Sequence, residues 1–132
     1  MIALDTNVLV RFLVQDDPVQ ARQAGEIIDQ LTEEAPGFVG REVLVELVWV
    51  LERAYRLDRE EIAGALDGLL ASTELMIEWA DAIGPALERY RNHGFGFADL
   101  MIAAAARRIG AGELVTFDRK VARLPGVRLL GL

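Results

Sequence analysis

Short apolar runs of strand length alternate with longer segments of helical periodicity along the whole chain. The run from Leu114 to Phe117 is bounded by turn residues, whereas the stretch from Pro18 to about Thr32 places its apolar side chains on one helical face. The pattern predicts strands at 2–4, 38–39, 75–79, 114–117 and 127–130, and helices at about 8–14, 18–32, 41–55, 58–70, 82–90 (with Pro85 near its start) and 98–109. Such alternation is typical of an α/β fold with a short, mostly parallel central sheet.

The chain of 132 residues fits one domain, residues 1–132, and contains no repeat or linker that would divide it. Hydrophobic residues make up 52% of the sequence, and this surplus predicts a surface for a partner or a homodimer. There is no cysteine, and His93 is the one histidine. Disulfides, thiolate catalysis and metal sites rich in sulfur or imidazole are therefore excluded, so any metal must be held by oxygen.

The amino terminus lacks the basic segment of a secretory signal, and no apolar run approaches the ~20 residues of a membrane span. We therefore expect a cytoplasmic protein with no membrane partner. A formal net charge of −7 argues against nonspecific binding to nucleic acid. Some basic residues nevertheless lie near two of the acids discussed below, where they either guide a phosphate or are ordinary cations at helix ends. These residues are Arg107, Arg108, Arg119, Lys120 and Arg123.

Four acidic residues interrupt or end apolar runs, where a carboxylate pressed against apolar neighbours is costly unless a cation satisfies it. They are Asp5, Glu46, Asp99 and Asp118. Asp5 and Asp118 each follow a predicted strand, so both emerge at one edge of the sheet if those strands are parallel neighbours. Glu46 and Asp99 would then come from helices packed beside that edge. The pattern predicts one divalent-metal site lined by four carboxylates.

Each of these acids also has an ordinary structural explanation. Asp5 is placed to cap the helix that follows it, and Asp99 to interact with the positive end of its own helix. Asp118 is equally suited to a plain turn beside its basic neighbours. Glu46 has apolar flanks, which predict that most faces of its helix are buried, but Glu42 one turn earlier leaves an exposed polar stripe as the alternative.

Clustered carboxylates without a cation would raise one another's pKa and destabilise the fold, and a hard divalent ion removes that cost. Oxygen ligands suit magnesium, with manganese as a possible substitute, and magnesium keeps several waters when bound. A metal-bound water is more acidic than bulk water, and the ion also stabilises charge on a phosphoryl oxygen. The chemistry that this arrangement favours is hydrolysis of a phosphodiester bond.

The four acids and their flanking residues resemble the acidic motifs of the PIN domain over nearly the whole chain. More narrowly, the length and the closing segment are similar to VapC-type toxins, the ribonuclease halves of bacterial and archaeal toxin-antitoxin pairs. The segments that carry the resemblance are Leu4-Asp5-Thr6-Asn7-Val8-Leu9, Val45-Glu46-Leu47, Phe97-Ala98-Asp99 leading into Ile102-Ala103-Ala104, and Thr116-Phe117-Asp118-Arg119-Lys120.

This resemblance implies a magnesium-dependent endoribonuclease with a three-layer α/β/α sandwich and the four acids grouped in a cleft. By the same analogy Asp5 and Asp99 are the most direct metal ligands, and Glu46 and Asp118 complete the site directly or through water. Asn7 and Thr116 are supporting candidates. The family also implies a small antitoxin that covers the cleft and contacts DNA on behalf of the complex, together with a homodimer of the toxin.

Two other functions compete with this one. An aspartyl-phosphate phosphotransferase would use Asp5 as its nucleophile, but the second acid it needs two residues later is replaced by Asn7, and its lysine would have to be Lys120. A non-catalytic PIN-like module would keep the fold and only bind a partner. Cleavage of RNA with magnesium or manganese separates these functions from the nuclease.

Overall fold

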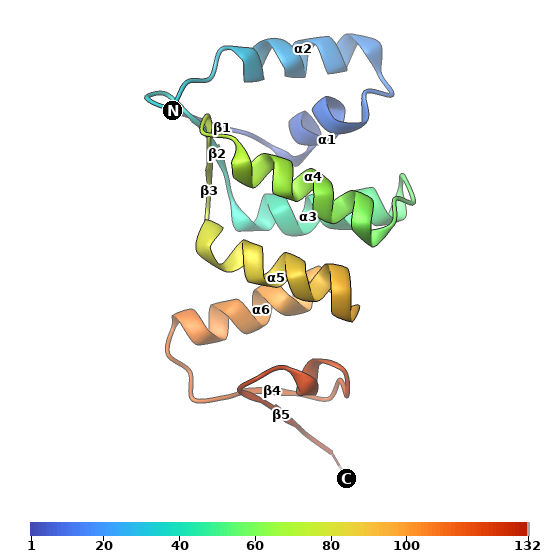
Figure 1. The fold of residues 1–132 in the computed structure, drawn as a ribbon, viewed down its shortest axis with the longest axis vertical. Helices are drawn as coiled ribbons and strands as arrows, with labels where there is room; N and C mark the ends of the chain where they lie inside the picture. Colours follow the sequence, from blue (N-terminus) through green and yellow to red (C-terminus); the bar gives the residue numbers. More distant parts are fainter. Residues whose placement is uncertain (132) are drawn as a thin grey trace. The chain divides into compact units, whose positions relative to one another are not determined.

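The computed structural model describes residues 1–131, which form helices joined by short parallel strands (Figure 1). By their internal contacts the residues fall into two compact units, the first from Met1 to Asp81 and the second beginning at Ala82. The α/β fold class and the parallel strand direction are confirmed. The assignment of residues 1–132 to a single domain stays a prediction.

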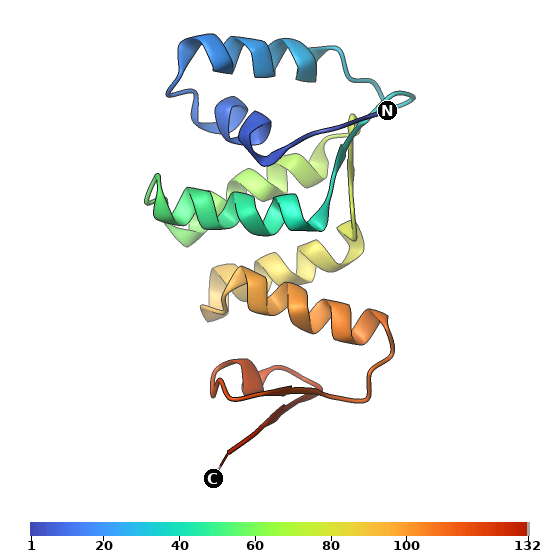
Figure 2. The same ribbon diagram turned by 180° about the vertical axis from the view of Figure 1, so that it is seen from behind.

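The first unit contains a parallel three-stranded sheet in the order β1-β2-β3. Ala3 pairs with Phe38, and Phe38 pairs in turn with Met76. Helix α3 contacts both α1 and α4, and α4 also contacts β3. Helices α3 and α4 lie side by side in both views of the ribbon (Figures 1 and 2). Its elements are β1 (Ile2–Ala3), α1 (Thr6–Val14), α2 (Pro18–Asp29), β2 (Gly37–Val39), α3 (Arg41–Arg53), α4 (Arg59–Ala71) and β3 (Leu75–Ile77).

Apolar side chains at helical spacing fill the core of the first unit. On α3 the buried positions repeat every three or four residues, as expected of a helix that presents one face to a core. At α4 the side chain of Asp58 accepts a hydrogen bond from the backbone of Glu61, whose side chain accepts one from the backbone of Asp58, which fixes the start of the helix. Fully or nearly fully buried side chains include Leu9, Val39, Leu44, Leu47, Val48, Leu51, Ile62 and Leu66.

The second unit contains two helices and a parallel pair of strands. The rings of Tyr90 and Phe97 meet edge to face with centroids 6.2 Å apart, so α5 and α6 pack through aromatic side chains. Strands β4 and β5 pair with Val115 opposite Arg128. Its elements are α5 (Ala80–His93, whose first two residues precede Ala82), α6 (Phe97–Arg108), β4 (Leu114–Thr116), η1 (Val121–Arg123, a 3₁₀ turn) and β5 (Val127–Leu129).

The bounds of two helices, α2 and α5, differ most from those predicted. Helix α2 ends at Asp29 and not near Thr32, because the chain leaves the helix through backbone bonds from Gln30 and Leu31 to carbonyls three residues back. Helix α5 begins at Ala80, so Pro85 lies inside it and not at its start, and it ends at His93 and not at Tyr90. Within residues 1–131 no helix combines the length and the apolar character needed to cross a bilayer.

Glu78 stabilises the start of α3 from the end of a neighbouring strand. The residue before α3 is Gly40, which has no side chain to cap the helix, and Glu78 Oε1 instead accepts a hydrogen bond of 2.8 Å from the backbone nitrogen of Arg41. Replacing Glu78 by Ala should therefore lower the free energy of unfolding by about 1 kcal/mol, the usual cost of a lost cap. Denaturant unfolding measures this. Glu78→Gln, which keeps an acceptor, should lose less, and equal losses in the two variants would refute the capping role.

Candidate metal and catalytic site

Asp5 and Glu46 are linked in the first unit through one buried threonine. Asp5 precedes α1 and accepts a hydrogen bond of 2.8 Å from the backbone nitrogen of Thr6. The hydroxyl of Thr6 donates to Glu46 Oε1 on α3. Thr6 is only 2% exposed, so its hydroxyl has little access to water, and the bond to Glu46 satisfies it. The carboxylates of Asp5, which follows β1, and of Glu46, in the middle of α3, therefore both accept a hydrogen bond from Thr6.

Glu46 lies on the exposed face of α3. Glu42, Glu46, Trp49 and Arg53 are all exposed and are spaced by three or four residues, while Leu47 and its neighbours on the opposite face are buried. The prediction that most faces of this helix are buried is therefore wrong, and the polar stripe considered as its alternative is present. The stripe is hard to predict from the sequence because it includes Trp49, a residue type usually found in a core. The side chain of Trp49 is 56% exposed.

Asp99 is the half-buried acid of the second unit. It lies in the first turn of α6, where burial raises the pKa of its carboxyl group and the negative charge of Asp118 raises it further. A methyl group added to Gly96 would lie 3.0 Å from Asp99 Oδ2, so the carboxylate folds back over the glycine that precedes the helix. The absence of a side chain at Gly96 leaves room for the carboxylate.

Asp118 is fixed by its own turn. Its Oδ1 atom accepts hydrogen bonds of 2.8 Å from the backbone nitrogen of Lys120 and 2.9 Å from that of Val121, and both bonds go to the same oxygen. The hydroxyl oxygen of Thr116, at the end of β4, accepts a bond of 3.0 Å from the backbone nitrogen of Asp118. Thr116 thus holds the turn that orients Asp118, as a supporting residue would.

The premise that all four acids press against apolar neighbours is wrong for three of them. Asp5, Glu46 and Asp118 are exposed, because each lies at the end of a strand or on the outer face of a helix. Asp99 is half-buried, and this burial raises the pKa of its carboxyl group. The electrostatic reason for a cation therefore rests on Asp99 and Asp118, and not on burial of the whole set.

The described contacts thus bring the acids together as two pairs. Asp5 and Glu46 share Thr6 in the first unit, and Asp99 and Asp118 interact through their charges in the second. Strand β1 pairs with β2, and β4 with β5, so the direct β1–β4 neighbourhood considered from the sequence is not among the strand pairs of residues 1–131. Within either unit, as far as residue 131, no three acidic or histidine side chains form a group able to hold an ion. The union of the two pairs in one site stays a prediction.

The donor atoms available at these pairs fit a hard divalent cation. All are carboxylate oxygens with a threonine hydroxyl beside them, the ligand types that magnesium and manganese prefer. A cation beside Asp99 and Asp118 would offset the repulsion that raises the pKa of Asp99.

Thr6 was absent from the supporting residues predicted from the sequence, which were Asn7 and Thr116. Asn7 is exposed in the first turn of α1 and lines a shallow pocket with Arg11 and Gln20, between α1 and α2. The available signal for Thr6 was its place directly after Asp5, but a hydroxyl there also suits an ordinary helix cap. The supporting role of Asn7 stays a prediction.

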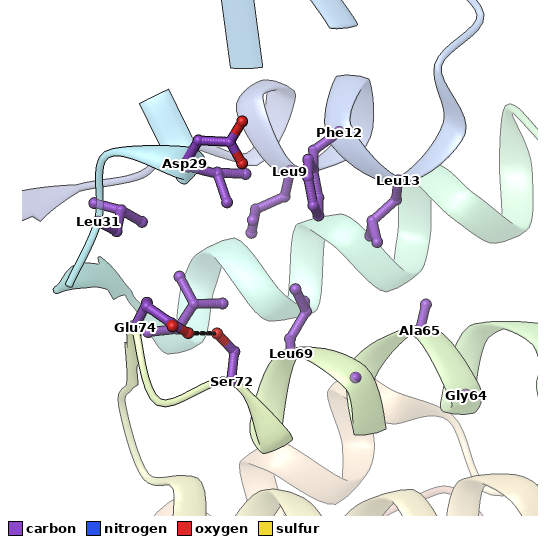
Figure 3. A pocket seen from close by; sticks show the side chains of 13 residues that line it. Leu9, Phe12, Leu13, Asp29, Leu31, Gly64, Ala65, Leu69, Ser72 and Glu74 are labelled. Carbon is purple, nitrogen blue, oxygen red and sulfur yellow. Dashed lines mark hydrogen bonds between the residues drawn. The ribbon is translucent and has the colours of Figure 1, made fainter. Parts of the chain in front are cut away.

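An apolar pocket lies within the first unit. It encloses about 570 Å³ between α1 and α4. Leu9, Phe12 and Leu13 of α1 face Leu69 of α4, and the rim includes the hydrogen bond from the Ser72 hydroxyl to a Glu74 carboxylate oxygen (Figure 3). Such a lining suits apolar contact with a partner and has none of the four predicted acids.

Similarity to known proteins extends over nearly the whole chain. A protein-family model described as the PIN domain matches residues 2–127. A curated relative, the VapC ribonuclease of Aquifex aeolicus (strain VF5), is 31% identical over 129 residues, which is 94% of this chain and 92% of the relative. The span matched by the family model includes all four predicted acids, from Asp5 to Asp118.

Proposed function

Because the chain belongs to the PIN-domain family, as its motifs predicted, we propose that it is a magnesium-dependent endoribonuclease and the toxin of a toxin-antitoxin pair. The observation that carries this proposal is the similarity to a VapC ribonuclease along almost the full length of both chains. The two acid pairs support it, since each contains one of the two most direct ligands expected, Asp5 and Asp99.

In this proposal one PIN-like domain, residues 1–132, joins the two pairs into a four-carboxylate site. Asp5 and Asp99 hold Mg²⁺ directly, and Glu46 and Asp118 hold it directly or through water, with Mn²⁺ as a substitute. When bound, the ion supplies an acidified water and stabilises charge on the phosphoryl oxygen, so that a phosphodiester bond of RNA is hydrolysed.

The protein's own residues prepare this site by fixing its oxygen atoms. Thr6 donates to Glu46 and so sets the rotamer of a carboxylate that solvent would otherwise leave free to turn. Two backbone N–H groups hold Oδ1 of Asp118, and Thr116 holds the turn beneath it. The partly buried position of Asp99 strengthens its attraction for a cation, because its charge is less well solvated there.

Cleavage of RNA by the purified chain tests this function. We expect cleavage with millimolar magnesium or manganese, none in EDTA, and at least about a hundredfold slower cleavage by Asp5→Asn, since a ligand of the ion is lost. Equal activity of the wild type and Asp5→Asn would reject the site. Absence of cleavage of any RNA by the wild type would favour a non-catalytic binding module, and a phosphorylated Asp5 would favour the phosphotransferase.

The proposal includes two protein partners, a small antitoxin and a second copy of the chain, in the cytoplasm. Apolar side chains exposed in the second unit support it, because such groups are commonly covered in complexes. They include Ile102, Ile109 and Phe117, which are 54%, 83% and 78% exposed. DNA contact would come only through the antitoxin. A short reading frame directly upstream of the gene, whose product co-purifies with this chain, is the expected result.

A further inference from the structure

A cationic pocket lies entirely within the second unit, on the turn that carries Asp118. It encloses about 430 Å³ and is formed by the last turns of α5, the segment after it, and η1 with the residue before it. None of its side chains has a part in the site proposed above, although the backbone nitrogen of Lys120 donates to Asp118. The lining residues are Glu88, Arg89, His93, Phe95, Lys120 and Arg123.

Positive charge dominates this pocket although the chain as a whole carries a net charge of −7. Arg89, Lys120 and Arg123 line it against a single carboxylate, that of Glu88. Glu88 already has a neighbour, because His93 Nε2 lies 3.5 Å from its Oε1 atom. The ion pairs of residues 1–131 engage none of the three cationic side chains. The pocket therefore offers an anion three positive groups that no acid of the described chain neutralises.

Lys120 is held in place by the segment between α5 and α6. Its ammonium lies 5.5 Å from the centroid of the Phe95 ring, a distance at which the ring attracts a cation. Phe95 is only 7% exposed, so its ring contacts the ammonium of Lys120 but is too buried to stack against a nucleobase. A methyl group at Gly94 would lie 2.9 Å from Lys120 Nζ, so the glycine is what lets the ammonium approach the backbone.

Lys120 connects the pocket to Asp118. The backbone nitrogen of Lys120 donates to Asp118 Oδ1, while its side chain lines the pocket. Arg123 lies in η1, and the backbone nitrogen of Val121, the first residue of this turn, donates to Asp118 Oδ1. The segment that carries Asp118 therefore also supplies two of the cationic side chains of the pocket, Lys120 and Arg123.

We propose that this pocket binds a backbone phosphate of the RNA strand adjacent to the bond that is cut, an inference that rests on the proposed function. Lys120 and the two arginines would donate charge-assisted hydrogen bonds to the non-bridging oxygens, which every nucleotide carries. The pocket thus positions the strand without reading its sequence. It also gives an acidic protein a local means of attracting RNA.

Binding of a labelled single-stranded RNA to the full chain in EDTA, where cleavage is stopped, tests this inference by fluorescence anisotropy. Lys120→Gln and Arg123→Gln should each weaken binding roughly three- to tenfold and reduce the salt slope of log K by about 0.7, the value for one phosphate contact on a single strand. Lys120→Arg should keep most of the affinity, because it keeps the charge.

Arg119→Gln is the matched control, since Arg119 is exposed in the same turn, carries the same charge and does not line the pocket. It should change the affinity less than Lys120→Gln. Equal losses in the two variants would mean a general charge effect and would overturn the pocket. Wild-type affinity in Lys120→Gln, with an unchanged melting temperature, would overturn it as well.

Two further measurements are needed. The first distinguishes an RNA phosphate from a small free anion, and the second distinguishes failure of this inference from failure of the proposed nuclease function. Inorganic phosphate at millimolar concentration should not displace the oligonucleotide, and displacement that depends on Lys120 would identify a site for small anions instead. In magnesium, Lys120→Gln should raise KM while kcat stays within a few-fold of the wild type. A wild-type chain that neither cleaves nor binds RNA refutes the proposed function, whereas one that does both, with Lys120→Gln unchanged, refutes only this inference.

Discussion

Replacing Asp99 by Asn should slow RNA cleavage at least about a hundredfold while raising the melting temperature of the metal-free protein. The loss of activity follows because a neutral amide is a much poorer ligand for a hard cation. The gain in stability follows because the ionised carboxyl group is partly buried and is repelled by Asp118, and Asn has the same shape without the charge. Activity assays and thermal unfolding in EDTA measure the two effects on the same preparation.

The pH dependence of stability gives this prediction a defined sign. The pKa of Asp99 is raised in the folded protein above its ordinary value of 3.8, so the folded state binds the proton more tightly than the unfolded chain does. As the pH rises from that value through the raised pKa, the wild type should lose stability that Asp99→Asn keeps. The difference between the two proteins should stay constant at higher pH.

Asp29→Asn provides the control, because Asp29 is an exposed acid at the end of α2 and lies outside the proposed site. It should leave RNA cleavage unchanged. A metal-free Asp99→Asn protein that melts below the wild type would contradict the electrostatic account of Asp99, and full activity in that variant would remove it from the site.

Replacing Thr6 by Val should reduce both stability and activity, although Thr6 has no charge and is not itself a proposed ligand. Val has a similar shape but lacks the buried hydroxyl that donates to Glu46, and the loss of this bond should cost about 1 kcal/mol of unfolding free energy. Glu46 is then free to rotate, and cleavage should slow roughly 10- to 100-fold, as when a group that orients a metal ligand is removed.

Thr6→Ser distinguishes a lost hydroxyl from a general change in packing. Serine keeps the donor, so this variant should keep most of the activity even if the missing methyl group lowers the melting temperature. The concentration of Mg²⁺ at half-maximal activity should rise in Thr6→Val and stay near the wild-type value in Thr6→Ser. The same rise in both variants would show that Thr6 acts through packing and not by positioning Glu46.

The order and type of the secondary-structure elements were predictable because their signals are local. Turn residues and helical periodicity bracket each segment, and Asp58 forms the cap that its sequence position indicates. The start of α5 was predicted near Pro85 because proline is common in the first turn of a helix, but the helix begins five residues earlier. The strand at Phe38 and Val39 was found although it has only three residues.

Burial of the acids and pairing of the strands were harder to predict because both depend on distant residues. Glu46 was expected in a largely buried helix, but the apolar run around it includes Trp49 on the exposed face. The neighbourhood of β1 depends on which strand bonds to it, and no local pattern in a short run of apolar residues specifies a partner. The contact of Thr6 with Glu46 spans forty residues and has no local signal for the same reason.

Metal binding by single variants of the two units tests the central claim that the two acid pairs hold one ion. Calorimetric titration with Mn²⁺ or Mg²⁺ should show binding to the wild type and comparable loss of that binding in Asp5→Asn, from the first unit, and in Asp99→Asn, from the second. Wild-type binding retained in either variant would contradict a shared site.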